Sequence, residues 1–194
     1  MKTFELERLP EYRDLAKNGS VVVFDTETTG LSNDDEVVQL AVVKFHKGEE
    51  QFAKAVYLRN SVPVDGTAAA VNGLTDAILR EKGLDPKEVL EDFLVMLGET
   101  VLAEGKVLLV AHNLSFDMRM MNNMFRRYGL SGFPKKAIGC CTKEFVKALA
   151  LPPEVLPSNH LRTCIEHLEI KGVNSHDALD DAKACAELFK FLVD

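Results

Sequence analysis

Residues 21–30 read Val-Val-Val-Phe-Asp-Thr-Glu-Thr-Thr-Gly, an apolar run that passes directly into two acids set two positions apart. Successive side chains of a β-strand point to opposite faces, so Asp25 and Glu27 lie on the same face as the apolar Val23. Two like charges about 4 Å apart repel by roughly 4 kcal/mol at an effective dielectric constant near 20. The stretch therefore predicts either a strand whose carboxylates hold a cation or an acid-rich turn that closes the strand.

The composition fits a single globular domain. The chain has 194 residues, of which 46% are hydrophobic and 27% charged, so it can bury a core without disulfides or structural metals. We expect a lead-in segment over residues 1–19 and one domain over residues 20–194. No apolar run approaches the roughly 18 residues of a membrane span, and the first residues show no signal-peptide pattern. We therefore expect a cytoplasmic protein with no membrane partner.

Charge is unevenly distributed along the chain. The formal net charge of −7 argues against a general polyanion binder. Residues 112–150 nevertheless contain seven basic and only two acidic residues. This segment is the predicted place for contact with a phosphate backbone, although solvated helix faces would produce the same pattern.

Hydrophobic periodicity predicts three strands in antiparallel order, followed by helices that alternate with further strands. A hairpin turn at residues 46–49 joins the second strand to the third. The first predicted strand begins at residue 20. The other four cover residues 36–45, 51–58, 107–111 and 137–141. The predicted helices cover residues 11–17, 68–71, 76–82, 87–103, 114–128, 143–149, 161–168 and 177–193. This order indicates an α/β fold in which helices cover both faces of a five-stranded mixed sheet.

Two predicted helices carry an acid on a face that is otherwise apolar. Asp181 heads the row that continues through Cys185 and Leu188, and Asp117 heads a row of methionines. A carboxylate in the first turn is favoured by the helix dipole, which gives an alternative explanation for each acid taken alone. Together with the two acids of the first strand, however, they predict a shared crevice at the carboxyl ends of the strands.

Four clustered carboxylates carry a charge that two divalent cations would neutralise, and oxygen ligands suit Mg²⁺ or Mn²⁺. Two such ions about 3.5–4 Å apart can promote an in-line phosphoryl displacement. His176 lies just before the last predicted helix, and a histidine can accept the proton of an attacking water at neutral pH. The pattern therefore predicts a two-metal site with His176 as the general base.

Three motifs containing these residues resemble the DEDDh family of 3′-5′ exonucleases, especially the epsilon proofreading subunit of bacterial DNA polymerase III and its stand-alone relatives. The motifs are Val-Phe-Asp-Thr-Glu-Thr-Thr-Gly-Leu at 23–31, Ala-His-Asn-Leu-Ser-Phe-Asp at 111–117, and His-Asp-Ala-Leu-Asp-Asp-Ala at 176–182. The resemblance runs from about residue 20 to the end and makes residues 20–194 an exonuclease domain. It implies a ribonuclease H-like fold and release of nucleoside 5′-monophosphates from a 3′ end.

The resemblance also implies residue roles. Asp25, Glu27 and Asp181 would hold the first metal, Asp117 would contribute to the second, and His176 would deprotonate the water. The residues that it places near the substrate are Thr28, Thr29, Gly30, Leu31, Asn72, His112, Asn113 and Phe116. Asn72 stands where proofreading relatives often have histidine, and nothing after the last predicted helix resembles a polymerase-binding tail.

We therefore expect a metal-dependent 3′-5′ exonuclease that acts on single-stranded DNA or frayed 3′ ends, with a DNA polymerase as a possible partner. One alternative is an exoribonuclease similar to ribonuclease T or oligoribonuclease, because only contacts to the 2′-hydroxyl distinguish the two substrates. Another is a non-catalytic module that binds nucleic acid or a polymerase. Retention of all four acids and His176 favours the catalytic hypotheses.

Overall fold

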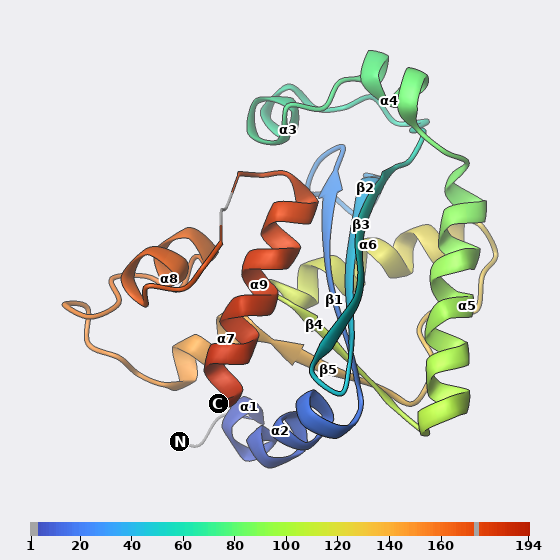
Figure 1. The fold of residues 1–194 in the computed structure, drawn as a ribbon. Coiled ribbons are helices and arrows are strands. Elements are labelled where there is room, and N and C mark those ends of the chain that lie inside the picture. Colours follow the sequence, from blue (N-terminus) through green and yellow to red (C-terminus); the bar gives the residue numbers. More distant parts are fainter. Residues whose placement is uncertain (1–3, 173–174) are drawn as a thin grey trace.

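A computed structural model describes residues 4–172 and 175–194 and has a five-stranded sheet at its centre, in the order β3-β2-β1-β4-β5 (Figure 1). β1 pairs antiparallel with β2 and parallel with β4, β2 pairs antiparallel with β3, and β4 pairs parallel with β5. β2 is thus the single strand of this sheet that runs against the others, which confirms the predicted mixed sheet. The strands are β1 (Ser20–Thr28), β2 (Val37–His46), β3 (Glu49–Tyr57), β4 (Val107–Ala111) and β5 (Ala137–Cys141).

Helices cover both faces of the sheet (Figure 1). One face is covered by α2, α7, α8 and α9, and the other by α5 and α6. None of the helices in the described ranges is long and apolar enough to cross a membrane. The helices are α1 (Phe4–Glu7), α2 (Leu9–Asn18), α3 (Gly66–Asn72), α4 (Asp76–Lys82), α5 (Pro86–Glu104), α6 (Leu114–Arg127), α7 (Thr142–Ala148), α8 (Leu161–His167) and α9 (Ala178–Val193).

The central strand β1 divides the core into two clusters. Val21 and Val23 pack in the cluster that includes α9, whereas Val22 and Phe24 pack in the cluster that includes α5 and α6. This twofold alternation sets the direction of the residues that follow Phe24. The side chains of Asp25 and Glu27 consequently emerge on the α9 side at the carboxyl end of the strand.

The β2-β3 hairpin turns at Lys47 and Gly48, which have positive φ angles of 52° and 81°. Two successive residues with positive φ are the mark of a type I′ turn, whose twist matches that of the flanking strands. The predicted turn at residues 46–49 is therefore confirmed. The glycine meets this requirement without the steric penalty that a larger residue would have.

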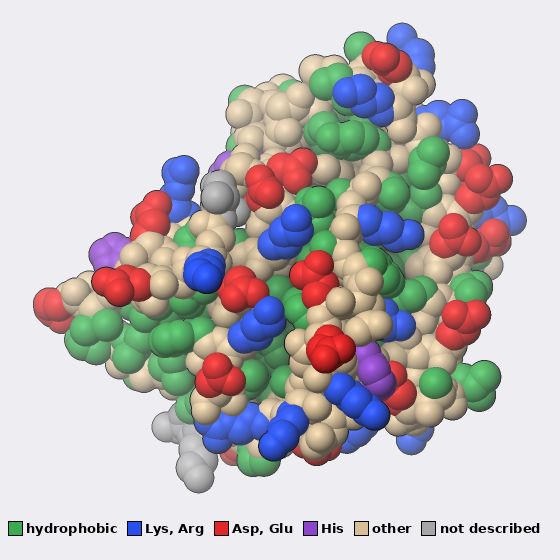
Figure 2. Space-filling model, viewed as in Figure 1, with side chains coloured by type: hydrophobic (Ala, Val, Ile, Leu, Met, Phe, Trp, Pro, Cys, Tyr) green, Lys and Arg blue, Asp and Glu red, His purple; other side chains and the backbone are tan. Residues whose placement is uncertain are grey.

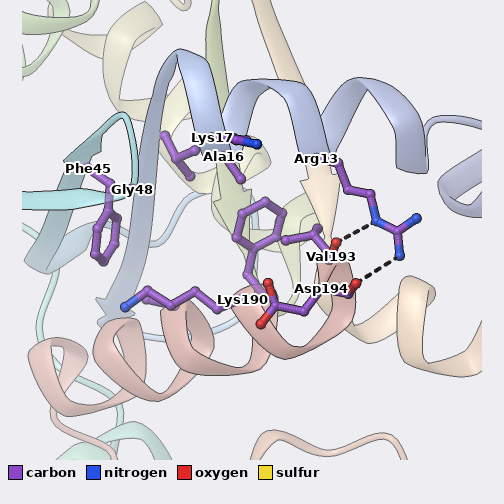
Figure 3. Close-up of a pocket in the computed structure, with 11 residues that line it drawn as sticks. Arg13, Ala16, Lys17, Phe45, Gly48, Lys190, Val193 and Asp194 are labelled. Carbon is purple, nitrogen blue, oxygen red and sulfur yellow. Dashed lines mark hydrogen bonds between the residues drawn. The ribbon is translucent and has the colours of Figure 1, made fainter.

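The predicted lead-in segment contains two helices that pack on the rest of the chain, and its residues 1–3 lie outside the described residues. Tyr12 of α2 is fully buried, and its hydroxyl lies 2.7 Å from Glu5 Oε2 and 3.0 Å from the carbonyl oxygen of Gly139 on β5. Arg13 Nε donates to the Val193 carbonyl oxygen at 2.6 Å, beside a hollow of about 400 Å³ between α2 and α9 (Figure 3). Residues 4–18 thus belong to the same packed unit as the sheet.

We expect Tyr12→Phe to lower the free energy of unfolding by about 1–3 kcal/mol, because it leaves the buried Glu5 carboxylate without its hydroxyl partner. Denaturant unfolding measures the change. Tyr57→Phe is the matched control, since the Tyr57 hydroxyl makes no hydrogen bond among the described residues. Equal stability of the Tyr12 variant and the wild type would contradict the structural role of this contact.

Candidate active site

Three carboxylates meet at the carboxyl end of β1. Asp25 and Glu27 come from that strand, and Asp181 comes from the first turn of α9. One oxygen from each lies within 4.8 Å of the others, and Asp181 is only 6% exposed. The packing of α9 against the Val21 and Val23 face therefore produces the predicted convergence of these three acids.

Asp117 reaches the same place from the opposite face of the sheet. It lies in the first turn of α6 and is 3% exposed, and its Oδ1 accepts hydrogen bonds from Thr26 N at 3.2 Å and Thr26 Oγ1 at 2.8 Å. It lines the same groove as the other acids but is not part of the three-residue cluster. The site thus straddles the end of β1, with Thr26 orienting Asp117 from between the two acids of the strand.

Burial and mutual repulsion favour the protonated forms of these acids. Burial, followed by the charges of Asp117 and Glu27, raises the pKa of Asp25 well above its usual range. The pKa of Glu27 is raised to about 7, mainly by burial, against a hydrogen bond from Asn72 that lowers it. Burial likewise raises the pKa of Asp117 to about 7, although the hydrogen bonds from Thr26 oppose the shift.

The donor set fits a divalent cation. All the converging ligand atoms are carboxylate oxygens, which are the ligands preferred by Mg²⁺ and Mn²⁺. Bound positive charge would also lower these pKa values, against the burial that chiefly raises them. Asp25, Glu27 and Asp181 are the residues that would hold such an ion, with Asp117 close enough for its charge to act on Asp25.

The acids lie in an open groove of about 560 Å³ that also contains His176. His176 is exposed and has a positive φ of 58°, a conformation that histidine adopts more readily than most residues. Asp177 follows as the N-cap of α9 and accepts a hydrogen bond from Leu179 N. The sharp change of backbone direction at His176 places its imidazole in the groove while Asp181 turns inward on the helix.

Gln39 anchors the start of α9 to the sheet, a contact that the sequence analysis missed. Gln39 lies opposite Glu27 in the β1-β2 register and is 3% exposed. Its Nε2 donates to Asp177 Oδ2 at 3.0 Å, and its Oε1 accepts from Ala178 N at 3.3 Å. A glutamine within the otherwise apolar run at residues 37–43 is the signal in the sequence that could have indicated a positioning role.

We expect Gln39→Leu to lower the free energy of unfolding by about 1–3 kcal/mol, because the buried cap loses both hydrogen bonds. We also expect magnesium affinity to fall by about 10–100-fold, the usual effect of losing a residue that orients a ligand. Denaturant unfolding and calorimetric titration with magnesium measure the two effects. The control is Gln51→Leu on exposed β3, and the prediction fails if both variants bind magnesium equally well.

The loop after β1 forms one rim of the site. Thr28 and Thr29 are buried, and their hydroxyls bond within the loop, to the Gly30 carbonyl oxygen at 2.6 Å and to Asp35 Oδ1 at 3.0 Å. A Cβ atom on Gly30 would lie 2.6 Å from Asp35 Oδ2, so a larger residue there would displace the carboxylate that bonds Thr29 and Ser32. Leu31, in contrast, is 77% exposed and faces solvent at the edge of the groove.

A second hollow, of about 510 Å³, adjoins the groove and shares Glu27 and Leu31 with it. Thr28, Gly30 and Asn72 also line this hollow, whereas Thr29 does not. The Asn72 side chain contacts Glu27 and lies 3.4 Å from the Thr28 carbonyl oxygen. Four of the predicted substrate-side residues, Thr28, Gly30, Leu31 and Asn72, therefore surround a cavity directly beside the acids.

Three other predicted substrate-side residues line the groove that contains the acids. Asn113 and Phe116 line the groove, and the guanidinium of Arg119 lies 5.2 Å from the centre of the Phe116 ring. His112 lines it too, but both ring nitrogens are used within the protein, by Thr142 Oγ1 at 3.0 Å and the Asn159 carbonyl oxygen at 2.9 Å. Burial lowers the pKa of His112 to about 4, so this histidine is neutral and holds the loop before α8.

Comparison with known proteins adds independent information. The family model described as Exonuclease, RNase_T, matches residues 22–189. Similar curated proteins include DNA polymerase III PolC-type from Oceanobacillus iheyensis, 35% identical over 178 residues and 89% of this chain. The corresponding protein of Caldanaerobacter subterraneus is 31% identical over 172 residues and 88% of this chain. The chain spans only 11% of the length of each of these relatives.

Among solved structures, Escherichia coli exonuclease I in complex with a dT13 oligonucleotide shares the fold. The TM-score is 0.76 at 20% sequence identity, and the match covers 90% of this chain and 41% of that protein. At this level of identity the likeness concerns the architecture. It confirms the ribonuclease H-like arrangement of sheet and helices expected from the three motifs.

Proposed function

Because the chain belongs to the exonuclease family designated RNase_T, we propose that it is a metal-dependent 3′-5′ exonuclease that removes nucleotides from single-stranded DNA. The observation that carries this proposal is the convergence of Asp25, Glu27 and Asp181 within 4.8 Å, in one groove with Asp117 and His176. These are the four acids and the histidine of the DEDDh type.

The proposed division of labour follows the position of each side chain. Asp25, Glu27 and Asp181 hold one divalent cation, and Asp117, kept in place by Thr26, completes a second position with Asp25. When bound, Mg²⁺ or Mn²⁺ supplies positive charge that activates the attacking water and stabilises the leaving oxygen. The four acids keep that charge beside the scissile phosphate.

His176 is the proposed general base. It is the one histidine of the described groove whose backbone is continuous with the cap of α9, so it moves as a unit with Asp181. The imidazole accepts a proton from the attacking water, and its exposure allows that proton to pass on to solvent. Of the other two histidines in the groove, His112 is engaged at both ring nitrogens, and His160 lies at the start of α8 rather than of α9.

The second hollow is the proposed place of the terminal nucleoside. Thr28, Leu31 and Asn72 offer backbone and apolar surface beside Glu27, and the space of about 510 Å³ is open to solvent. DNA is proposed rather than RNA because the similar curated proteins are named as DNA polymerases and the fold neighbour was solved with an oligodeoxynucleotide.

The test uses a single-stranded oligonucleotide labelled at either end. With Mg²⁺ or Mn²⁺, a 3′ label should appear at once as a nucleoside 5′-monophosphate, and a 5′ label should give a ladder of shortened strands. Chelation should stop the reaction. The proposal fails if the full-length strand persists or if a chelator does not affect digestion. Faster digestion of a matched RNA would identify RNA, not DNA, as the substrate.

A further inference from the structure

Most basic residues of segment 112–150 are occupied within the protein. Arg119 donates to Asn33 Oδ1 at 2.8 Å and to the Leu31 carbonyl oxygen at 3.2 Å, and Arg127 pairs with the buried Glu36. These two arginines hold the loop between β1 and β2 against α6. They stabilise the rim of the site and do not form a surface for a nucleic acid.

The remaining basic residues of this segment differ in their relation to the groove. Lys135 and Lys136 precede the amino end of β5, at the end of the sheet away from the acids. Lys147 pairs with Glu144 at 3.4 Å on the solvent-facing side of α7. Lys143, one turn earlier on the same helix, is the member of the segment that lines the groove, and Arg162 of α8 joins it there.

The side chains of Lys143 and Arg162 can bind a phosphate group. The side chain of Lys143 makes no hydrogen bond or ion pair within the described ranges, although its charge acts on His112. Arg162 contacts Glu166 at 3.6 Å, and the two side chains are 68% and 61% exposed. Exposed ion pairs of this kind contribute at most about 1 kcal/mol, so a phosphate can replace the carboxylate.

The groove that contains the acids and the second hollow beside it differ in the basic residues of their walls. The groove that contains Lys143 and Arg162 has basic residues in its wall, whereas Asp35 and Asp65 line the second hollow and no Lys or Arg does. On the face shown in Figure 2, basic and acidic side chains are interspersed, and no broad basic surface is present. Of the two hollows, only the groove thus offers basic side chains to a polyanion.

Resting on the proposed function, we propose that Lys143 and Arg162 form a phosphate-binding wall that takes the backbone of single-stranded DNA on the 5′ side of the scissile bond. The terminal nucleoside has no phosphate beyond it and can occupy the hollow that lacks cations. Every preceding nucleotide adds a negative charge, which the wall attracts and the acidic hollow repels. The wall thereby sets the direction in which the strand leaves the site.

The test compares the variant Lys143→Ala/Arg162→Ala with the control Lys147→Ala/Arg126→Ala. Both variants lose one lysine and one arginine, but Lys147 and Arg126 lie outside the groove. KM and kcat are measured on a strand of about 12 nucleotides and on a dinucleotide, over a range of salt concentrations. For the longer strand, the wall variant should have a KM about tenfold higher than wild type and a kcat within about twofold of it. The slope of log KM against log salt concentration should be smaller by about 1.4, because two phosphate contacts are lost.

For the dinucleotide, the wall variant should match the wild type, because no phosphate precedes the scissile one. An equal rise in KM on both substrates, or an unchanged slope of log KM against log salt, would contradict the proposed phosphate-binding wall. Binding of the longer strand, measured by fluorescence anisotropy in an Asp25→Asn background, separates the two proposals. A wild type without nuclease activity would defeat the proposed function, whereas the anisotropy comparison still decides whether the wall binds phosphate.

Discussion

Replacing Asp25 with Asn will abolish the proposed exonuclease activity and at the same time raise the melting temperature of the metal-free protein. Asp25 interacts with the charges of Asp117, Glu27 and Asp181, so its loss removes the carboxylate shared by all the proposed metal positions. We expect kcat to fall at least about a thousandfold, since the charge stabilisation supplied by bound metal is worth several kcal/mol. The same substitution relieves like-charge repulsion in the folded state.

The stability effect has a defined pH dependence. A carboxyl group whose pKa is raised by folding destabilises the native state as pH rises from about 4, where unfolded acids ionise. The loss is complete only above the folded pKa values, which are about 7 for Glu27 and Asp117. In the presence of a chelator, the free energy of unfolding of the wild type should therefore fall as pH rises from about 4 to above about 7. The fall should be smaller for Asp25→Asn.

Thermal unfolding with a chelator measures the difference, and about 1 kcal/mol corresponds to roughly 2–4 °C in a domain of this size. Asp92→Asn, at an exposed position on α5, is the matched control and should change neither activity nor melting temperature. An Asp25→Asn protein that melts at or below the wild-type temperature at pH 8 would show that the acids are not in mutual repulsion. Retained activity would remove Asp25 from the metal site.

Replacing His176 with Ala will lower kcat by about 10²–10⁴-fold, the usual contribution of a positioned general base. Magnesium affinity should change little, because His176 is not part of the carboxylate cluster. The folded structure should also persist, since His176 is exposed and Asp177 still caps α9. The variant therefore separates proton transfer from metal binding.

Single-turnover digestion of a labelled strand gives the rate, and calorimetric titration gives the affinity for magnesium. His160→Ala is the control, because His160 lines the same groove but belongs to the start of α8. The kcat of this control should stay within about threefold of wild type. Equal losses of rate and magnesium affinity in the His176 variant would make this residue a ligand. A normal rate would mean that another group takes the proton.

Much of the fold could be predicted from the sequence because its elements have a strong local pattern. The strands at 107–111 and 137–141 have the predicted bounds, and the helix at 76–82 also begins and ends where it was predicted. The hairpin turn depends on Lys47-Gly48, which encodes its own backbone conformation. The four-residue helix α1 was missed, because so short a segment has no hydrophobic period to detect.

The site was only partly predictable for a physical reason. Asp25, Glu27, Asp117 and Asp181 stand out because each places a charge on an apolar face, which needs no knowledge of neighbours in space. The residues that orient them depend on tertiary contacts, such as the bond between Gln39 and Asp177, which lie 138 positions apart. Thr26 lies between two acids in the sequence, yet only the packing of α6 shows that it bonds Asp117.

The attachment of α9 to β2 through Gln39 has a consequence for biosynthesis. The proposed base His176 and the proposed ligand Asp181 follow all five strands in the sequence, so they leave the ribosome after the sheet and reach β1 only when α9 docks. On the proposed roles, a nascent or truncated polypeptide without this helix can neither gather the cation nor cleave DNA. On these roles, nuclease activity begins only when α9 docks on the sheet.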